Sequence, residues 1–337
     1  MEIKFFKINE KREWDKELIE REGSFLQCWA WGDFQERLSK KVFRIEMKDE
    51  GLWLRAQIIK ENLPFGISYF YIPFGPFFNF ENNFEKKEKL LLELANNLVF
   101  LAKKERAIFL KIEPKNEIPN PKGFFISKKR IQPQKTLILD LKKDVKSLFE
   151  SFSRRTKYGI RRSTRSGLEL EIKEEIDDDF EVFFKLLKET EKRKKISFFP
   201  KKYYEELLKT KNEFLKTKLF LAKYQKKPVA AHLLVCFGNT VTYLHGAHDY
   251  EKRKLRASFF LHWQEILWAK ENNFQFFDFW GIDEIKWPTL TTYKKGFGGF
   301  EFVYPPSQVF VFSNFWYTLY NLGKKLKDCF KTYVRKN

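Results

Sequence analysis

The feature that most constrains the fold is an order of predicted elements that occurs twice along the chain. In the first half, residues 52–60 and 66–72 have the composition and alternation of strands. A helical stretch follows from about Phe84 to Lys104, and the apolar run 107–114 predicts one more strand. The first half is therefore expected to form strands, a helix and a closing strand.

The second half repeats this order. Residues 215–237 predict two strands joined by a tight turn at Gln225 to Pro228, and residues 240–247 predict a third. A helix is expected over 256–273 and a closing strand over 274–280. An antiparallel meander, a helix and a further strand, made twice, predict an α/β (α+β) protein. Each of its two lobes would be a mixed, largely antiparallel sheet flanked by helices.

Length and charge agree with two lobes and a polyanionic partner. A chain of 337 residues is long for one average domain and suits two of roughly 150 residues. There are 65 Lys and Arg residues against 45 Asp and Glu, so the formal net charge is +20. This excess predicts a nucleic acid or an acidic membrane surface as partner, although base-composition bias in the genome is the alternative explanation.

Cysteine and histidine patterns indicate neither a disulfide framework nor a metal site. Cys28, Cys236 and Cys329 are far apart, and His245 and His248 are the one close histidine pair. We therefore expect no metal and no cofactor. The first 20 residues are charged throughout, and no stretch reaches the roughly 18 apolar residues of a membrane span, so a cytoplasmic location is expected.

Two basic segments have helical spacing. Arg154, Lys157, Arg161 and Arg165 are three or four residues apart and fall on one face of a helix that ends at Gly167. A solvated face is one interpretation. Because like charges at this spacing destabilise an isolated helix, an anion bound along the face is the other.

The last segment, residues 314–337, is basic and amphipathic. Its apolar side consists of Phe315, Leu319, Leu322, Leu326, Phe330 and Val334. Such a helix would either pack against the first lobe or lie on an anionic membrane surface.

Five stretches, in the family's order, resemble the Fem family of aminoacyl-tRNA-dependent transferases, which build the interpeptide bridges of peptidoglycan. They are residues 24–35, 71–76, 153–170, 246–282 and 290–304. The resemblance implies two GNAT-like lobes, with residues 1–143 and 310–337 on the acceptor side and residues 144–309 on the donor side. Only residues 188–207 stand where some members carry a long helical arm, so the chain resembles the armless, FemX-like type.

The resemblance also implies site residues. Tyr293 and Lys294 match an aromatic–lysine pair that handles the acceptor end of the tRNA, and Glu113 matches an acidic residue near the acceptor. Three further residues match positions that face the cleft, namely Tyr203, Tyr243 and His245. Gln35 is also an expected substrate-binding residue. Some relatives have a lysine near the positions of Asp33 and Gln35 and an arginine near that of Phe199, which contact the phosphates of the precursor and which this chain lacks. A lipid-linked precursor is therefore favoured over a soluble, UDP-linked one.

The residues themselves fit transfer from an activated ester, which needs mainly positioning and stabilisation of charge. Lys294 could hold a phosphate or the developing negative charge, while Glu113 or Asp278 could orient or deprotonate the acceptor amine. The remaining expectations are grouped by role. Glycines that let the backbone approach the ligand are Gly296, Gly298 and Gly299; aromatic residues that could stack on terminal bases are Tyr293, Phe297 and Phe300; cations that could grip RNA or the precursor diphosphate are Arg154, Lys157 and Arg161. A β-hairpin turn with ordinary aromatic packing is the alternative interpretation of residues 290–304.

Two other functions remain open at this point. A GNAT-type acyltransferase using acyl-CoA would need a glycine-containing pyrophosphate loop, whereas the residues before the helix at 256 read EKRKLRAS. A non-catalytic protein that binds RNA or a membrane surface would need only the basic helices. The amino acid transferred, the number of residues added and the oligomeric state leave no pattern that can be interpreted.

Overall fold

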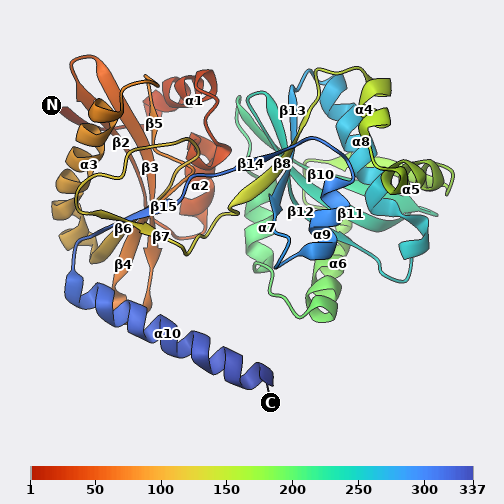
Figure 1. Cartoon of the computed structure of the whole chain (residues 1–337). Helices are drawn as coiled ribbons and strands as arrows, with labels where there is room; N and C mark the ends of the chain where they lie inside the picture. The colour runs from red at the N-terminus through yellow and green to blue at the C-terminus, as the bar shows by residue number, and fades with distance from the viewer. Residues whose placement is uncertain (1, 337) are drawn as a thin grey trace. The chain divides into compact units, whose positions relative to one another are not determined.

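The computed structural model describes the backbone of residues 2–336 and the side chains of residues 3–326, and it consists of two compact units (Figure 1). Unit 1 comprises residues 1–131 and 305–337, and unit 2 comprises residues 132–304. The units thus divide at 131/132 and 304/305, whereas divisions at 143/144 and 309/310 were expected from the sequence. The strand β8 (Lys135–Asp140) pairs with strands of unit 2, because its alternating apolar residues complete that sheet.

Unit 1 is an eight-stranded sheet covered by helices. Its strands lie in the order β1 (Glu2–Phe5), β2 (Val42–Asp49), β3 (Leu52–Asn62), β4 (Ser68–Pro73), β6 (Ala107–Glu113), β15 (Ser307–Val311) and β7 (Phe124–Ser127), with β5 (Phe77–Phe78) paired to β3. The helices are α1 (Lys11–Glu20), α2 (Trp29–Arg37), α3 (Phe84–Glu105) and α10 (Asn314–Lys336), with short 3₁₀ turns η1 (Ile8–Glu10), η2 (Phe25–Gln27) and η3 (Pro64–Gly66). The strands β4 and β6 are parallel and are joined through α3, while the other pairs are antiparallel.

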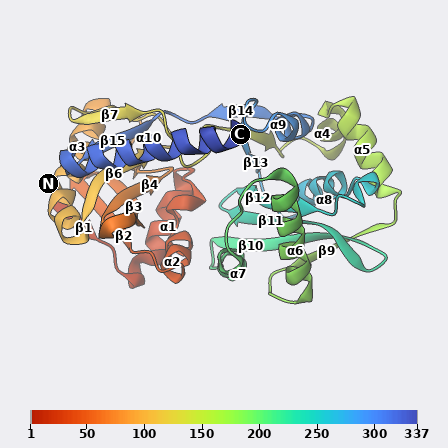
Figure 2. The same ribbon diagram turned by 90° about the horizontal axis from the view of Figure 1, so that it is seen from below.

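The helix α3 forms for local and tertiary reasons. The Asn83 side chain accepts a hydrogen bond from the Lys86 amide at its start, and Arg106 adopts the left-handed conformation (φ 56°) at its end. Leucines on one face, Leu90, Leu91, Leu94 and Leu98, are buried against the sheet. Figure 2 shows α10 beside β15 and β6 of the same unit, which it contacts through Trp316, Tyr317 and Tyr320.

Unit 2 has a seven-stranded sheet of the same plan. Its strands lie in the order β14 (Phe300–Val303), β8, β13 (Phe276–Ile282), β12 (Thr240–His248), β11 (Lys227–Phe237), β10 (Leu215–Tyr224) and β9 (Leu168–Lys173). The helices are α4 (Val145–Ser151), α5 (Arg154–Thr164), α6 (Asp178–Lys194), α7 (Lys201–Leu208), α8 (Ala257–Glu271) and α9 (Pro288–Lys295), with a 3₁₀ turn η4 (Arg253–Leu255). Here α8 joins the parallel strands β12 and β13.

The two parallel strand pairs differ in length. In unit 1, β4 and β6 pair from Ser68 with Ala107 to Pro73 with Glu113. In unit 2, β12 and β13 pair only over three positions, which end at Thr242 with Asp278. Beyond that point β12 continues beside β11, and β13 continues beside β8 after a shift of register. The two strands therefore separate, and the side chains that follow on each can face a shared space.

The predicted fold class and element order are confirmed, with two local corrections. The helix expected to run to Gly167 is two helices, because Ser153 breaks it and caps α5 by accepting a hydrogen bond from the Thr156 amide. Residues 288–295, expected to be a loop or a hairpin turn, form the helix α9, which Pro288 begins. None of the helices in the described part of the chain has the length and hydropathy that crossing a bilayer requires.

Candidate functional site

Lys294 lies near the end of α9 in unit 2 with its side chain buried. Its Nζ donates a hydrogen bond to the carbonyl oxygen of Gly281 at 2.8 Å and lies 3.5 Å from that of Trp280. It also lies 5.5 Å from the ring centroid of Tyr243. Trp280 has a left-handed backbone (φ 59°) at the register shift of β13, so the bend in this strand turns these carbonyl groups toward the ammonium.

Burial lowers the pKa of Lys294 to about 7, and the charge of Asp278 opposes this shift only in part. Lys294 therefore loses its proton much more readily near neutral pH than an exposed lysine does. An anionic ligand beside it would raise the pKa again and would be held by a full charge. An ammonium has three donors, of which the two carbonyl groups engage two, so one proton can be directed at a ligand.

Asp278, the last residue of β13 that pairs with β12, organises the bend. Its carboxylate accepts hydrogen bonds from the Thr136 hydroxyl and from the Trp280 amide, the latter at 2.7 Å. Because these bonds engage the carboxylate within the protein, its observed contribution is to fix the strand and to favour the charged form of Lys294.

A buried triad, His232–Glu265–His262, lies next to Lys294 and was not predicted from the sequence. The two carboxylate oxygens of Glu265 are each 2.7 Å from an Nδ1, one of His232 on β11 and the other of His262 on α8. All three side chains are at most 2% exposed. The available signal was the pair of polar residues at positions i and i+3 of a largely apolar helix, together with a histidine inside an apolar strand.

The protonation of the triad follows from its contacts. Burial by itself raises the pKa of Glu265, but its interactions with the two histidines outweigh burial and hold the pKa low, at about 2. Burial lowers the pKa of His262 to about 4. A carboxylate that accepts from both Nδ1–H groups is the arrangement that we assign, which leaves Nε2 of His262 as a hydrogen-bond acceptor.

Two polar atoms in this region have no hydrogen-bond partner among the described residues. They are Nε2 of His262 and the hydroxyl of Tyr293, whose rings lie 5.7 Å apart. Buried polar atoms are nearly always paired with protein, water or ligand. These two atoms, an acceptor and a donor close to Lys294, are therefore suited to a polar ligand or an ordered water.

The same triad is the group in the described chain that could hold a metal ion, since its ligand atoms lie within 4.8 Å of one another. The contacts fit a hydrogen-bond network better. Each Nδ1 faces a different oxygen of one carboxylate at hydrogen-bonding distance, and the positive charge of Lys294 further lowers the pKa of His262 and would disfavour a second cation.

The glycines and Phe297 have a different role from the one expected. The amides of Gly296 and Gly298 donate to carbonyl groups of α9, and a Cβ at Gly296 would lie 2.4 Å from the Thr156 hydroxyl. Phe297 is fully buried and packs on Phe152, so neither its ring nor these amides face a ligand. These residues instead end α9 tightly against the start of α5.

That packing brings the basic stripe to the site. The Ser153 amide donates to the carbonyl oxygen of Gly296 at 2.8 Å, so α5 begins directly beside the end of α9. Arg154 and Arg161 are exposed on α5, and Lys157 forms a 3.1 Å ion pair with Glu150. The predicted helical face is thus present, and it starts next to the segment that carries Lys294.

The aromatic residues of β12 lie beyond the point where this strand leaves β13. The ring of Tyr243 contacts His232 and His262, at centroid distances of 4.7 and 4.5 Å. Further along, His245 packs edge-on against Tyr203, and burial lowers the pKa of His245 to about 3. The structure therefore gathers Tyr243, Tyr293, Lys294 and Asp278 around one region of unit 2.

The residues expected on the acceptor side lie in unit 1. Glu113 is fully buried at the end of β6, where it accepts hydrogen bonds from the Tyr71 hydroxyl at 2.8 Å and the Ile131 amide at 2.6 Å. Lys111 lies 3.6 Å away. Gln35 is buried on α2. These side chains belong to a separate group from the one around Lys294.

Comparison with known proteins identifies relatives of both units. The model of the FemAB family matches residues 10–121, and that of an acetyltransferase (GNAT) domain matches residues 150–295. The lipid II:glycine glycyltransferase of Staphylococcus haemolyticus is 27% identical over 230 residues, which are 61% of this chain and 52% of that protein. The counterpart from Staphylococcus epidermidis is 27% identical over 229 residues, with the same coverage. The chain spans about half the length of these curated relatives.

Solved structures share the fold. The crystal structure of FemX superposes with a TM-score of 0.77 at 19% identity, covering 95% of this chain and 99% of that one. A tandem GNAT protein from the clavulanic acid biosynthesis pathway superposes with a TM-score of 0.58 at 12% identity, covering 93% and 99%. At these identities the likeness establishes two GNAT-like lobes.

Proposed function

This chain belongs to the FemABX family, and from that membership we propose that it is an aminoacyltransferase. It moves an amino acid from an aminoacyl-tRNA to the stem-peptide amine of a peptidoglycan precursor, forming a peptide bond of the interpeptide bridge. The observation that carries this proposal is the buried Lys294, whose pKa is about 7, beside the separation of β12 and β13. The lipid II glycyltransferases among the relatives support the reaction class.

On the donor side, Lys294 is proposed to bind a phosphate at the end of the donor or the negative charge that develops at the ester during transfer. The acceptor amine attacks the ester carbonyl, and charge develops first on the tetrahedral oxygen and then on the departing ribose oxygen. An ammonium in a site of low dielectric stabilises that charge more strongly than one in water. The Tyr293 hydroxyl and Nε2 of His262 supply a donor and an acceptor close by.

The proton of the amine needs an acceptor. The departing ribose oxygen is the proposed one, and Nε2 of His262 is proposed to orient the N–H group by accepting a hydrogen bond, because Glu265 fixes the imidazole with Nδ1 as donor. Glu113 in unit 1 is retained as the proposed residue that orients the amine, together with Gln35 for acceptor binding. Tyr203, Tyr243 and His245 are retained as substrate-binding residues.

The basic stripe on α5 is proposed to hold RNA phosphates. Arg154, Lys157 and Arg161 lie on α5, which begins beside the end of the helix that carries Lys294. The phosphates of a single-stranded acceptor end bound near Lys294 could therefore lie along this face of α5. The precursor diphosphate is the alternative ligand for the stripe.

A lipid-linked precursor is the proposed acceptor, with the UDP-linked form as the alternative. The chain would then work at the inner face of the membrane, as a cytoplasmic protein in peripheral contact with anionic lipid.

The match to an acetyltransferase (GNAT) domain favours one second candidate, acyl transfer from acyl-CoA. The residues that open α8 are Arg253, Lys254, Leu255 and Arg256, without the glycines that a pyrophosphate loop of this kind uses. Saturable binding of acyl-CoA in a calorimeter would support this candidate, and its absence would remove it.

The proposed function is tested by a transfer assay. Purified protein is incubated with tRNAs charged with labelled amino acids and with a detergent-solubilised, lipid-linked precursor, with and without ribonuclease. Label that appears on the precursor and is lost after ribonuclease treatment is the expected result, and it would also name the amino acid. No label on either the lipid-linked or the UDP-linked precursor, from a protein that binds tRNA, would contradict the proposal and favour a binding protein.

A further inference from the structure

One side of α10 is apolar and exposed. Trp316, Tyr317 and Tyr320 pack against unit 1, whereas four other apolar side chains on the helix face solvent. These four form what we call the apolar ridge: Phe315 (71% exposed), Leu319 (46%), Leu322 (54%) and Leu326 (63%). Their spacing of four, three and four residues aligns them along one side of the helix. A line of this length has no function in the packing of unit 1 itself.

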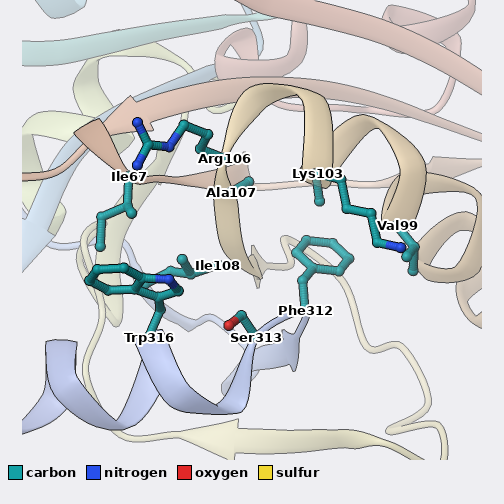
Figure 3. Close-up of a pocket in the computed structure, with 10 residues that line it drawn as sticks. Ile67, Val99, Lys103, Arg106, Ala107, Ile108, Phe312, Ser313 and Trp316 are labelled. Atoms are coloured by element: carbon teal, nitrogen blue, oxygen red, sulfur yellow. The ribbon is translucent and has the colours of Figure 1, made fainter. Parts of the chain in front are cut away.

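A pocket of about 210 Å³ lies at the N-terminal end of this helix (Figure 3). Figure 3 shows the rings of Phe312 and Trp316 along one side, and Lys103 and Arg106 of the α3 end along the other. Ile67 and Ile108 add to the apolar wall. The pocket therefore combines apolar walls with two cations, which suits an anionic amphiphile rather than a neutral or purely ionic ligand.

Three exposed phenylalanines are close in sequence to residues that line this pocket. Phe100 is 79% exposed and follows Val99 of the lining, and Phe315 is 71% exposed and precedes Trp316. Phe65, in the η3 turn, is 83% exposed, and the neighbouring Gly66 lies close to the Arg106 guanidinium. Exposed rings on segments that also line a basic, apolar pocket are expected where a surface inserts into the boundary between lipid headgroups and acyl chains.

The charge of α10 selects among possible partners. By sequence, residues 314–336 contain the cations Lys324, Lys325, Lys327, Lys331, Arg335 and Lys336 and the single carboxylate Asp328. Two copies of such a helix would repel each other, which disfavours self-association through the ridge. An RNA partner would pair with the cations but leave the leucines in water. An anionic bilayer offers phosphates to the cations and an apolar interior to the leucines.

We propose that the apolar ridge and the rim of the pocket dock unit 1 on an anionic phospholipid bilayer. The ridge and the three phenylalanines lie at the level of the upper acyl chains, the exposed Lys325 faces the lipid phosphates beside the ridge, and Lys103 and Arg106 each face phosphates at the edge of the pocket. The purpose of this surface rests on the proposed function, because docking would bring the enzyme to a lipid-linked acceptor. Its physical evidence lies within unit 1 alone.

The experiment measures co-sedimentation of the full chain with vesicles, without tRNA or precursor. Vesicles of phosphatidylcholine alone are compared with vesicles that also contain phosphatidylglycerol. The ridge variant replaces Leu319, Leu322 and Leu326 by Gln, which preserves helix propensity. The pocket variant combines Lys103→Gln with Arg106→Gln. The controls are Ile8→Gln, an equally exposed apolar residue near β1, and Lys16→Gln on α1, at the opposite edge of the sheet.

The wild type is expected to bind the anionic vesicles and not the neutral ones at physiological salt. The ridge variant is expected to lose about tenfold or more in partitioning, the pocket variant severalfold, and the controls less than about twofold. Equal binding by the ridge variant, or equal binding to both kinds of vesicle, would overturn the docking surface. So would a wild-type dimer that the ridge variant dissociates, or a loss of tRNA affinity in that variant with vesicle binding unchanged.

Transfer assays separate this surface from the proposed function. In detergent, the ridge variant is expected to transfer amino acid to the solubilised precursor at the wild-type rate, while transfer to precursor embedded in anionic vesicles falls about tenfold. Vesicle binding without any transfer would contradict the proposed function alone. Transfer at equal rates in detergent and on vesicles by wild type and variant would contradict the docking surface alone.

Discussion

The two units share one plan but use it differently. In unit 1 the parallel strands β4 and β6 remain paired to their ends, and Glu113 at the last pair is held by Tyr71 and by the Ile131 amide. In unit 2 the equivalent strands separate after Asp278, and a buried lysine and two unpartnered polar atoms lie where they part. Because β12 and β13 have fewer paired residues than β4 and β6, polar side chains can line the space where β12 and β13 separate.

The two units also differ in how completely their buried charged groups are shielded from solvent. In unit 1, the buried carboxylate of Glu105 pairs with Lys41 and Lys60, both of which reach solvent. In unit 2, Glu265 is fully buried between two imidazoles. Such groups are costly unless their hydrogen bonds are complete, so their retention indicates a role for the arrangement beyond packing.

The largest effect is expected from removal of the central carboxylate. Glu265→Ala leaves two buried imidazoles without their acceptor and should lower the local stability of unit 2 by about 3 to 5 kcal/mol. Glu105→Ala, the matched change in unit 1, should cost about 1 kcal/mol, since water can replace its partners. Hydrogen exchange of the β11 and β12 amides, compared with that of β3 and β4, reads the two units separately. Equal losses in both variants would contradict the distinction.

Lys294→Met should lower the single-turnover rate of transfer by about 10²- to 10³-fold, because it removes the cation proposed to stabilise the transition state. The control is Lys87→Met on α3, which also removes a buried lysine whose pKa is lowered by burial, but in unit 1. Its rate should stay within about threefold of wild type. A small loss of transfer rate in Lys294→Met, or an equal loss in Lys87→Met, would contradict a catalytic role for the lysine of unit 2.

The pH dependence of stability should also differ between wild type and Lys294→Met. The folded pKa of Lys294, about 7, is below its ordinary value of 10.5, so the unfolded chain binds more protons between these pH values. This group therefore makes unit 2 more stable as pH rises from about 7 to 10, on the order of 1 kcal/mol per pH unit. The difference between the two proteins in hydrogen exchange of β13 should show this slope. A difference that does not change with pH would be inconsistent with a buried, titrating lysine.

The smallest effect compares two helix caps. Ser153→Ala in unit 2 and Asn83→Ala in unit 1 each remove a side-chain acceptor at a helix start and should each cost about 1 kcal/mol. The Ser153 variant alone should weaken tRNA binding, by about twofold to fivefold, because α5 carries the basic stripe. A filter-binding titration of both variants measures this. Equal tRNA affinities of the two variants would contradict a role of the basic stripe in RNA binding.

Much of the fold could be predicted because its signals are local. The 3.6-residue period of α3 and the alternation of β10 and β11 are visible in the sequence, as is the turn at Gln225 and Lys226, both of which have positive φ. The break at Ser153 and the helix α9 were missed. The first depends on a single cap, and the second lies in a segment whose glycines and aromatic residues are required by packing against α5.

The site was predicted only in part. Lys294 and Tyr293 were proposed from a motif and its resemblance, Asp278 was proposed as a carboxylate on an apolar strand, and the structure brings the three together. His232, His262 and Glu265 were not predicted, because their association depends on the pairing of β11 with β12 and on the packing of α8, which link residues more than 30 positions apart. Phe297 and the glycines were assigned to ligand contact although their spacing equally fits the end of a helix.

Proton uptake on donor binding tests the central claim most directly, namely that the separated strands of unit 2 hold the anionic end of the donor beside Lys294. An RNA minihelix bearing an amide-linked amino acid is titrated into wild type and Lys294→Met at about pH 8, in buffers of different ionisation enthalpy. Because an anion beside the ammonium raises its pKa from about 7, wild type should take up a large fraction of a proton and the variant none. Binding without uptake, or with the same uptake in both proteins, would mean that the donor is held elsewhere.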